Sequence, residues 1–125
     1  MRNNFIPFVY AKELKDLGFN ENCFAYYDLA EGLKPIDNYS FNFRSLSDGL
    51  IYAPLWQQAF KFFRDKYKLS GIPMDNRYEI INLEFEDLIS GSEFIIKEYP
   101  ILGFEQAQSD CIFMLIQLAK EVNNV

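Results

Sequence analysis

Residues 54–67 read PLWQQAFKFFRDKY, and this stretch carries the strongest helical pattern in the chain. Its apolar side chains, most of them aromatic, recur at helical spacing and form one stripe: Trp56, Ala59, Phe60, Phe63 and Tyr67. The polar side chains gather on the opposite face: Gln57, Lys61, Arg64, Asp65 and Lys68. Pro54 suits a first helical turn, and Gly71 and Pro73 end the helix. The stretch therefore predicts a helix whose aromatic face packs into a core rather than offering a stacking platform to a ligand.

Two further helices are predicted, one on each side of this stretch. Residues 8–17 have broadly helical apolar spacing, and Gly18 stands where a C′ glycine closes a helix. Residues 104–122 predict a longer helix. Its core face is expected to carry Phe104, Ala107, Cys111, Met114, Leu115, Leu118 and Val122.

The segments between the helices have the composition of strands and turns. Residues 23–29 form an aromatic run of strand length, and residues 39–44 alternate strictly between aromatic and polar side chains. Residues 78–85 predict a strand with residues 94–96 as its hairpin partner. This strand places Ile81, Leu83 and Phe85 on one side. The segment 30–38 contains turn formers and is expected to be a turn: Gly32, Pro35, Asp37 and Asn38.

The resulting order is α-β-β-α-β-β-α, which predicts an α+β fold. We expect one domain over residues 1–125, with an antiparallel sheet and the helices packed on one of its faces. Such a sheet can leave its other face in water. The polar residues suited to that face are Ser40, Asn42, Arg44, Glu84 and Glu86.

Composition and charge limit the function. Half of the 125 residues are hydrophobic, so the chain can form a core, and 18% are aromatic, which suits a core or an interface. The net charge of −6 argues against binding to nucleic acid or to an anionic membrane, because both depend on basic residues. The ordinary interpretation of this charge is solubility, and the sharper one is mimicry of an acidic ligand such as DNA.

The sequence offers few groups for catalysis. It contains no His, which excludes Ser-His-Asp and Cys-His nucleophiles and the usual zinc sites, and no glycine-rich phosphate loop. Cys23 and Cys111 are far apart and flanked by apolar residues, so we expect buried free thiols. The carboxylates Glu84, Glu86 and Asp87 and the basic stripe Lys61, Arg64 and Lys68 are expected to be solvated surface. We therefore predict a protein that is not an enzyme and binds no metal or cofactor.

Neither a signal peptide nor an apolar stretch of membrane-spanning length is found, so the cytoplasm is the expected location.

One irregularity in the predicted C-terminal helix suggests a binding partner. Phe113 and Ile116 lie on the polar face of the helix 104–122, with Ile112 at its border. Such residues are either covered by the chain or kept for a partner. We predict Ile112, Phe113 and Ile116 as a protein interface, either with another protein or in a homo-oligomer.

Several stretches together resemble a family of small uncharacterised proteins from Bacteroidetes genomes and their phages and prophages. They are AKELKDLGF at 11–19, CFAYY at 23–27, APLWQQAFKFFRDKY at 53–67, and FEQA at 104–107 leading to Cys111 and Leu115-Ile116. The resemblance implies a phage or mobile-element setting and carries no activity. The leading hypothesis is therefore a small non-enzymatic accessory protein that binds other proteins. The alternative is an acidic DNA mimic that inhibits a nucleic-acid-binding enzyme.

Overall fold

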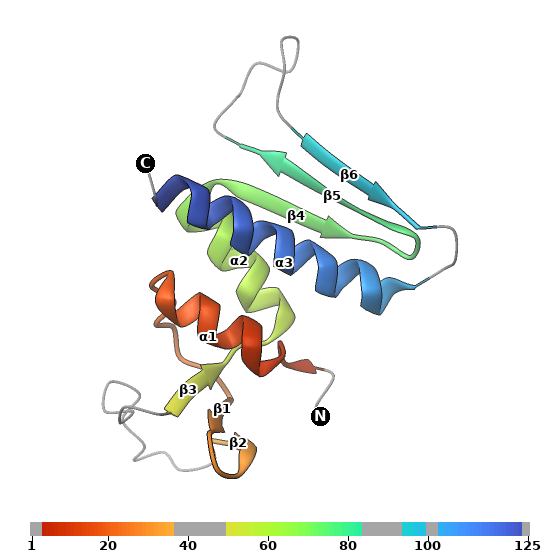
Figure 1. Cartoon of the computed structure of the whole chain (residues 1–125). Helices are drawn as coiled ribbons and strands as arrows, with labels where there is room; N and C mark the ends of the chain where they lie inside the picture. The colour runs from red at the N-terminus through yellow and green to blue at the C-terminus, as the bar shows by residue number, and fades with distance from the viewer. Residues whose placement is uncertain (1–3, 37–49, 84–93, 100–102, 124–125) are drawn as a thin grey trace. The chain divides into compact units, whose positions relative to one another are not determined.

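The computed structural model describes residues 4–36, 50–83, 94–99 and 103–123 (Figure 1). The elements follow the order α-β-β-β-α-β-β-β-α, and the predicted α+β class is confirmed. The chain divides into two compact units, Met1–Ala59 and Phe60–Val125, and the boundary falls inside helix α2. This division is not visible in the sequence, and a single domain over 1–125 stays a prediction.

The first unit contains helix α1 (Phe8–Asp16) and the strands β1 (Ala25–Asp28), β2 (Gly32–Pro35) and β3 (Leu50–Ala53). The strands form an antiparallel sheet in the order β2-β1-β3, and α1 packs against β3. The core of this sheet is a cluster of buried residues with partly buried neighbours: Phe5, Ala25 and Ala53, with Tyr27, Leu33 and Leu55 against them.

Gly18 closes α1 as predicted. It has a φ of 103°, a left-handed backbone conformation that residues other than glycine rarely adopt. The Phe19 amide donates to the Leu14 carbonyl at 2.9 Å, and the Gly18 amide donates to the Lys15 carbonyl at 3.0 Å. These two bonds define a Schellman motif, which satisfies the last carbonyls of the helix and turns the buried Phe19 back against it.

The second unit contains most of α2 (Trp56–Tyr67), the strands β4 (Leu69–Pro73), β5 (Arg77–Asn82) and β6 (Phe94–Glu98), and helix α3 (Phe104–Asn123). The strands form a second antiparallel sheet in the order β4-β5-β6. Helix α3 packs against β4 and β5. A Cβ added to Gly71 would lie 2.8 Å from Leu115 Cδ1, so any larger residue there would force the side chains of α3 to shift.

Helix α2 confirms the amphipathic prediction. Ala59 and Phe63 are fully buried, and the rest of the predicted stripe is partly buried. Every polar residue assigned to the opposite face is exposed: Gln57, Lys61, Arg64, Asp65 and Lys68. The ring of Phe62 is also buried, at an edge-on angle to Phe63. The aromatic residues of this helix are therefore core residues.

Three strands were not predicted from the sequence. The segment 30–38 was expected to be a turn, but it contains β2, and neither β3 nor β4 was foreseen. Both β2 and β4 are edge strands that end in a proline, Pro35 and Pro73, and each contains a glycine. Proline is tolerated at such positions because no neighbouring strand needs its missing N–H. The predicted strand 39–44 lies outside the described residues.

Candidate functional site

The β4-β5-β6 sheet has one face covered by α3. Gly71, Ile80 and Ile95 are directly opposite one another across the three strands. Ile80 and its neighbour on the same face, Tyr78, are buried, and Gly71 meets Leu115 and Cys111 of α3. This face is therefore part of the core of the second unit.

The other face of the sheet carries apolar side chains that remain exposed. Ile72, Glu79 and Ile96 are directly opposite one another across the strands, and Ile81 is two residues from Glu79 on the same side of β5. Ile72 is 36% exposed and Ile96 is 45% exposed, while Ile81 is half-buried. Leu83, just beyond β5, is also exposed. We call Ile72, Glu79, Ile81 and Ile96 the open sheet face.

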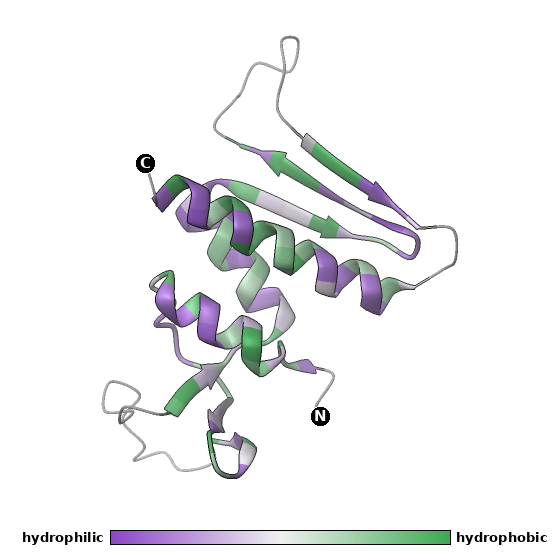
Figure 2. Cartoon of the chain, viewed as in Figure 1, coloured by the Kyte–Doolittle hydropathy of each residue, from purple (hydrophilic) through white to green (hydrophobic). Residues whose placement is uncertain are grey.

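The strands β5 and β6 are apolar on both sides. In β5, Tyr78 and Ile80 point to the covered face and Ile81 to the open one; in β6, Ile95 and Ile96 divide in the same way. Figure 2 shows hydrophobic residues in β5 and in the middle of β6. Antiparallel sheets with one face in water normally alternate between apolar and polar residues, whereas strands covered on both faces do not. The composition of this sheet is thus typical of one with a layer on each side.

Charged residues define the polar features of the open sheet face. The half-buried Glu79 lies between Ile72 and Ile96. Arg77, at the end of the same side of β5, is directly opposite Glu98 of β6, a favourable cross-strand pair of charges. Whatever covers the centre of this face must therefore satisfy the Glu79 carboxylate.

Of the three residues predicted as an interface on α3, only one is exposed. Ile112 and Ile116 are buried, at 0% and 1% exposure, whereas Phe113 is 48% exposed. The buried residues of α3 are Ala107, Cys111, Ile112, Leu115, Ile116 and Ala119. This stripe is rotated from the predicted one: Ile112, Ile116 and Ala119 are buried, whereas the predicted Met114 and Leu118 are half-buried. Phe104 and Val122, at the ends of the helix, are exposed. The interface prediction on this helix now rests on Phe113.

The described residues contain no cluster of three or more Asp, Glu or Cys side chains that could hold a metal ion. The carboxylates Glu84, Glu86 and Asp87 lie outside them. Cys23 and Cys111 are buried free thiols, as predicted. Burial raises the pKa of each thiol to about 12, and the thiolate is the reactive form, so neither is an activated nucleophile.

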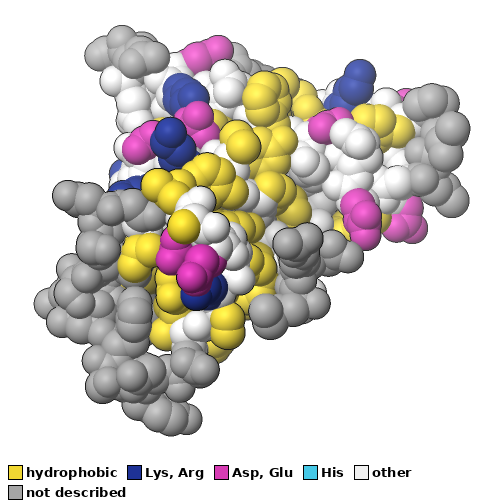
Figure 3. All heavy atoms as spheres, turned by 60° about the horizontal axis from the view of Figure 1, so that its bottom comes forward, with side chains coloured by type: hydrophobic (Ala, Val, Ile, Leu, Met, Phe, Trp, Pro, Cys, Tyr) yellow, Lys and Arg dark blue, Asp and Glu magenta, His cyan; other side chains and the backbone are white. Residues whose placement is uncertain are grey.

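Surface charges of both signs are mixed. Lys61 pairs with Asp65 at 2.5 Å on the exposed side of α2, and Lys34 pairs with Glu31 in the first unit. Figure 3 shows basic and acidic side chains lying beside one another on the face in view.

None of the helices in the described part of the chain combines the length and apolar character that a membrane span requires.

No protein-family model matches this chain, and no curated protein or solved structure matches it either. The family resemblance therefore stays a prediction. Any function must be argued from the residues themselves, and the open sheet face is the feature that most needs an explanation.

Proposed function

We propose that this chain is a non-enzymatic accessory module that binds another protein through the open sheet face. The observation that carries the proposal is the exposure of Ile72 and Ile96 on a sheet whose strands are apolar on both sides. We place the module in the cytoplasm, in a phage or mobile-element setting, as the sequence resemblance implies.

The open sheet face has the chemistry of an interface. Fully burying an exposed Ile or Leu side chain contributes roughly 1.5–3 kcal/mol, so covering the partly exposed Ile72, Ile81, Ile96 and Leu83 contributes a part of that at each position. A binding partner must also supply a hydrogen-bond donor to Glu79, because burying a carboxylate without such a donor costs free energy. The matching surface is therefore apolar, with a Lys, an Arg or another hydrogen-bond donor opposite Glu79.

Affinity capture tests this proposal. The tagged full-length chain, its Ile96→Asp variant and its Val9→Asp variant are incubated with extracts of phage-infected host cells. Val9 is a matched control, because it is 64% exposed on α1 and belongs to the first unit, whereas this sheet belongs to the second. We expect a captured protein that Ile96→Asp loses and Val9→Asp retains. Capture that survives Ile96→Asp, or no capture at all, contradicts the proposal.

Self-association is the other form of protein binding that the open sheet face supports. Light scattering over a range of concentrations distinguishes a second copy from a different partner. A dimer that Ile96→Asp converts to a monomer identifies the open sheet face as its interface. A dimer that instead responds only to Phe113→Asp would move the interface to α3, where Phe113 is exposed.

The alternative of an acidic DNA mimic needs carboxylates ranked at phosphate-like spacing. Among the described residues, Asp65 and Glu31 are paired with lysines, which interrupts such a row. The exposed residues Lys61, Arg64 and Lys68 would support direct contact with nucleic acid, but Asp65 lies among them. Binding of DNA or RNA that weakens steeply as salt rises would favour that contact over the proposed protein interface.

A further inference from the structure

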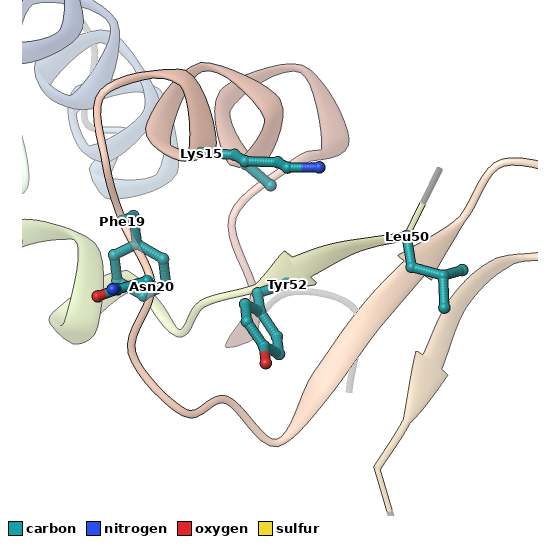
Figure 4. Close-up of a pocket in the computed structure, with 6 residues that line it drawn as sticks. Lys15, Phe19, Asn20, Leu50 and Tyr52 are labelled. Atoms are coloured by element: carbon teal, nitrogen blue, oxygen red, sulfur yellow. The ribbon is translucent and has the colours of Figure 1, made fainter. Parts of the chain in front are cut away.

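Whereas the open sheet face belongs to the second unit, the first unit contains a small pocket between α1 and β3. Its volume is about 160 Å³. The lining residues come from α1, from the segment after it and from β3: Ala11, Lys15, Phe19, Asn20, Leu50 and Tyr52 (Figure 4). All of them belong to the described residues of one unit.

The local structure explains why this pocket is apolar. Ala11 is small and buried on the inner side of α1, so it leaves space that a larger side chain would fill. The Schellman motif at Gly18 holds the buried Phe19 against the end of the helix. Leu50 and Tyr52 are two residues apart in β3 and therefore lie on the same face of the strand. Two aromatic rings and two aliphatic side chains thus form the lining.

The rim of the pocket carries two polar side chains, those of Lys15 and Asn20, and both residues are exposed. Neither side chain has a hydrogen bond or ion pair with any residue that the structure describes. Lys34 and Lys61, in contrast, are each paired with a carboxylate. Figure 4 shows the two side chains pointing in opposite directions, with the Asn20 amide turned away from Lys15. The Lys15 ammonium is therefore the donor available at the mouth of this apolar pocket.

We propose that this pocket binds a small carboxylic acid with a single aromatic ring. A cavity of about 150 Å³ lined by apolar side chains holds one benzene, so the available volume admits one ring and little more. The rings of Phe19 and Tyr52 favour an aromatic ligand, which they contact edge-on or with an offset. The carboxylate would lie at the rim, where the Lys15 ammonium donates to it.

Protein NMR titrations test this proposal with benzoate as the probe and benzyl alcohol as its neutral counterpart. We expect benzoate to shift the backbone amides of Ala11, Phe19 and Leu50 in a saturable manner. Benzyl alcohol is expected to bind about tenfold more weakly, because it lacks the charge-assisted hydrogen bond, whose contribution is moderate at an exposed rim. Lys15→Met should remove the preference for benzoate, whereas Lys12→Met, at another exposed lysine of α1, should preserve it.

The comparison of benzoate with benzyl alcohol on the unaltered chain tests the preference for a carboxylate even if a variant unfolds. Equal affinity for benzoate and benzyl alcohol would overturn the assignment of the carboxylate to Lys15. Shifts that do not saturate, or that map to the basic side of α2 instead of this pocket, would overturn the site itself. Loss of the preference in Lys12→Met as well as in Lys15→Met would show general charge attraction and would also refute the proposal.

Discussion

Ile80 and Ile81 are consecutive isoleucines of β5, yet they lie on opposite faces of the β4-β5-β6 sheet and in different surroundings. Ile80 is buried on the face that α3 covers. Ile81 is half-buried beside Ile72 and Ile96 on the open sheet face. The two residues have the same chemistry, so the difference comes from the layer that lies above each face. One layer is supplied by this chain, and we propose that the other is supplied by a partner.

This comparison has a consequence for stability. Residues on the covered face contribute to the free energy of unfolding of the chain itself, because their burial is complete on folding. Residues on the open sheet face contribute little until a partner covers them. Substitutions at matched positions on the two faces should therefore separate folding from binding.

The largest difference is expected between Ile80→Ala and Ile96→Ala. Truncating the buried Ile80, which is 2% exposed, should lower the free energy of unfolding by about 2–5 kcal/mol. Truncating Ile96, which is 45% exposed, should cost less than about 1 kcal/mol. Urea denaturation followed by circular dichroism measures both values. Equal losses at the two positions would show that the open sheet face is already covered within the folded chain, and the proposed binding surface would be abandoned.

Gly71→Ala tests how closely α3 lies on the covered face. The new Cβ would lie 2.8 Å from Leu115 Cδ1 and 2.9 Å from Cys111 Sγ, and both of these side chains are buried. Because the packed core leaves little room for them to move, we expect a loss of about 1–3 kcal/mol in the same denaturation experiment. Ser70→Ala is the control, since Ser70 is the next residue on the other side of β4. A Gly71→Ala variant as stable as Ser70→Ala would be inconsistent with this close contact.

The buried Cys111 thiol of α3 makes the covered face sensitive to alkaline pH. Burial raises its pKa from 9.0 to about 12, so the folded chain keeps a proton that the unfolded chain releases above pH 9. The free energy of unfolding should therefore fall as pH rises past 9, by up to about 1.4 kcal/mol per pH unit for this thiol. Urea denaturation of the wild type and of Cys111→Ala at several pH values gives the two slopes. The variant should have the shallower slope, and parallel slopes would contradict a buried, protonated thiol.

The helices were predictable because their signals are local. The aromatic stripe of α2 and the Gly18 signal of α1 both lie within the element that they define. The unpredicted strands depend on distant partners instead: β4 is a strand because it pairs with β5, although Gly71 and Pro73 have the composition of a turn. A pattern within one segment cannot report hydrogen bonds made to another.

The candidate site was only partly predictable for a similar reason. Alternation assigned Glu84 and Glu86 to the water-facing side and so made the opposite side, with Ile81, the expected core side. This expectation is wrong for β5: Tyr78 and Ile80 are buried, and Ile81 lies on the open sheet face, because both sides of the strand are apolar. On α3, the helical period locates an apolar face to within about one residue position. A shift of one position in the predicted face explains why Ile112 and Ile116, expected on or beside the polar face, are buried, while Phe113 is exposed.

The smallest predicted loss of stability concerns a hydrogen bond between the end of β6 and α3. The Tyr99 hydroxyl, just beyond β6, donates to Asp110 Oδ2 at 2.5 Å, and Gln106 donates to the other oxygen of this carboxylate at 2.8 Å. Tyr99→Phe should cost about 1 kcal/mol, the usual net value of one hydrogen bond. A double-mutant cycle with Asp110→Asn isolates the pair, because the loss at Tyr99 should shrink once Asp110 is changed.

Hydrogen exchange in the Tyr99→Phe variant then sharpens the comparison of the two faces. If this bond holds β6 to the helix, the amides of β6 should exchange faster while those of β5, which pairs on both sides, keep their protection. Uniformly faster exchange throughout the sheet would mean instead that the covered face opens as one unit. In that case Ile96 of β6 would be anchored by the same core as Ile80, and the open sheet face would be as rigid as the covered one.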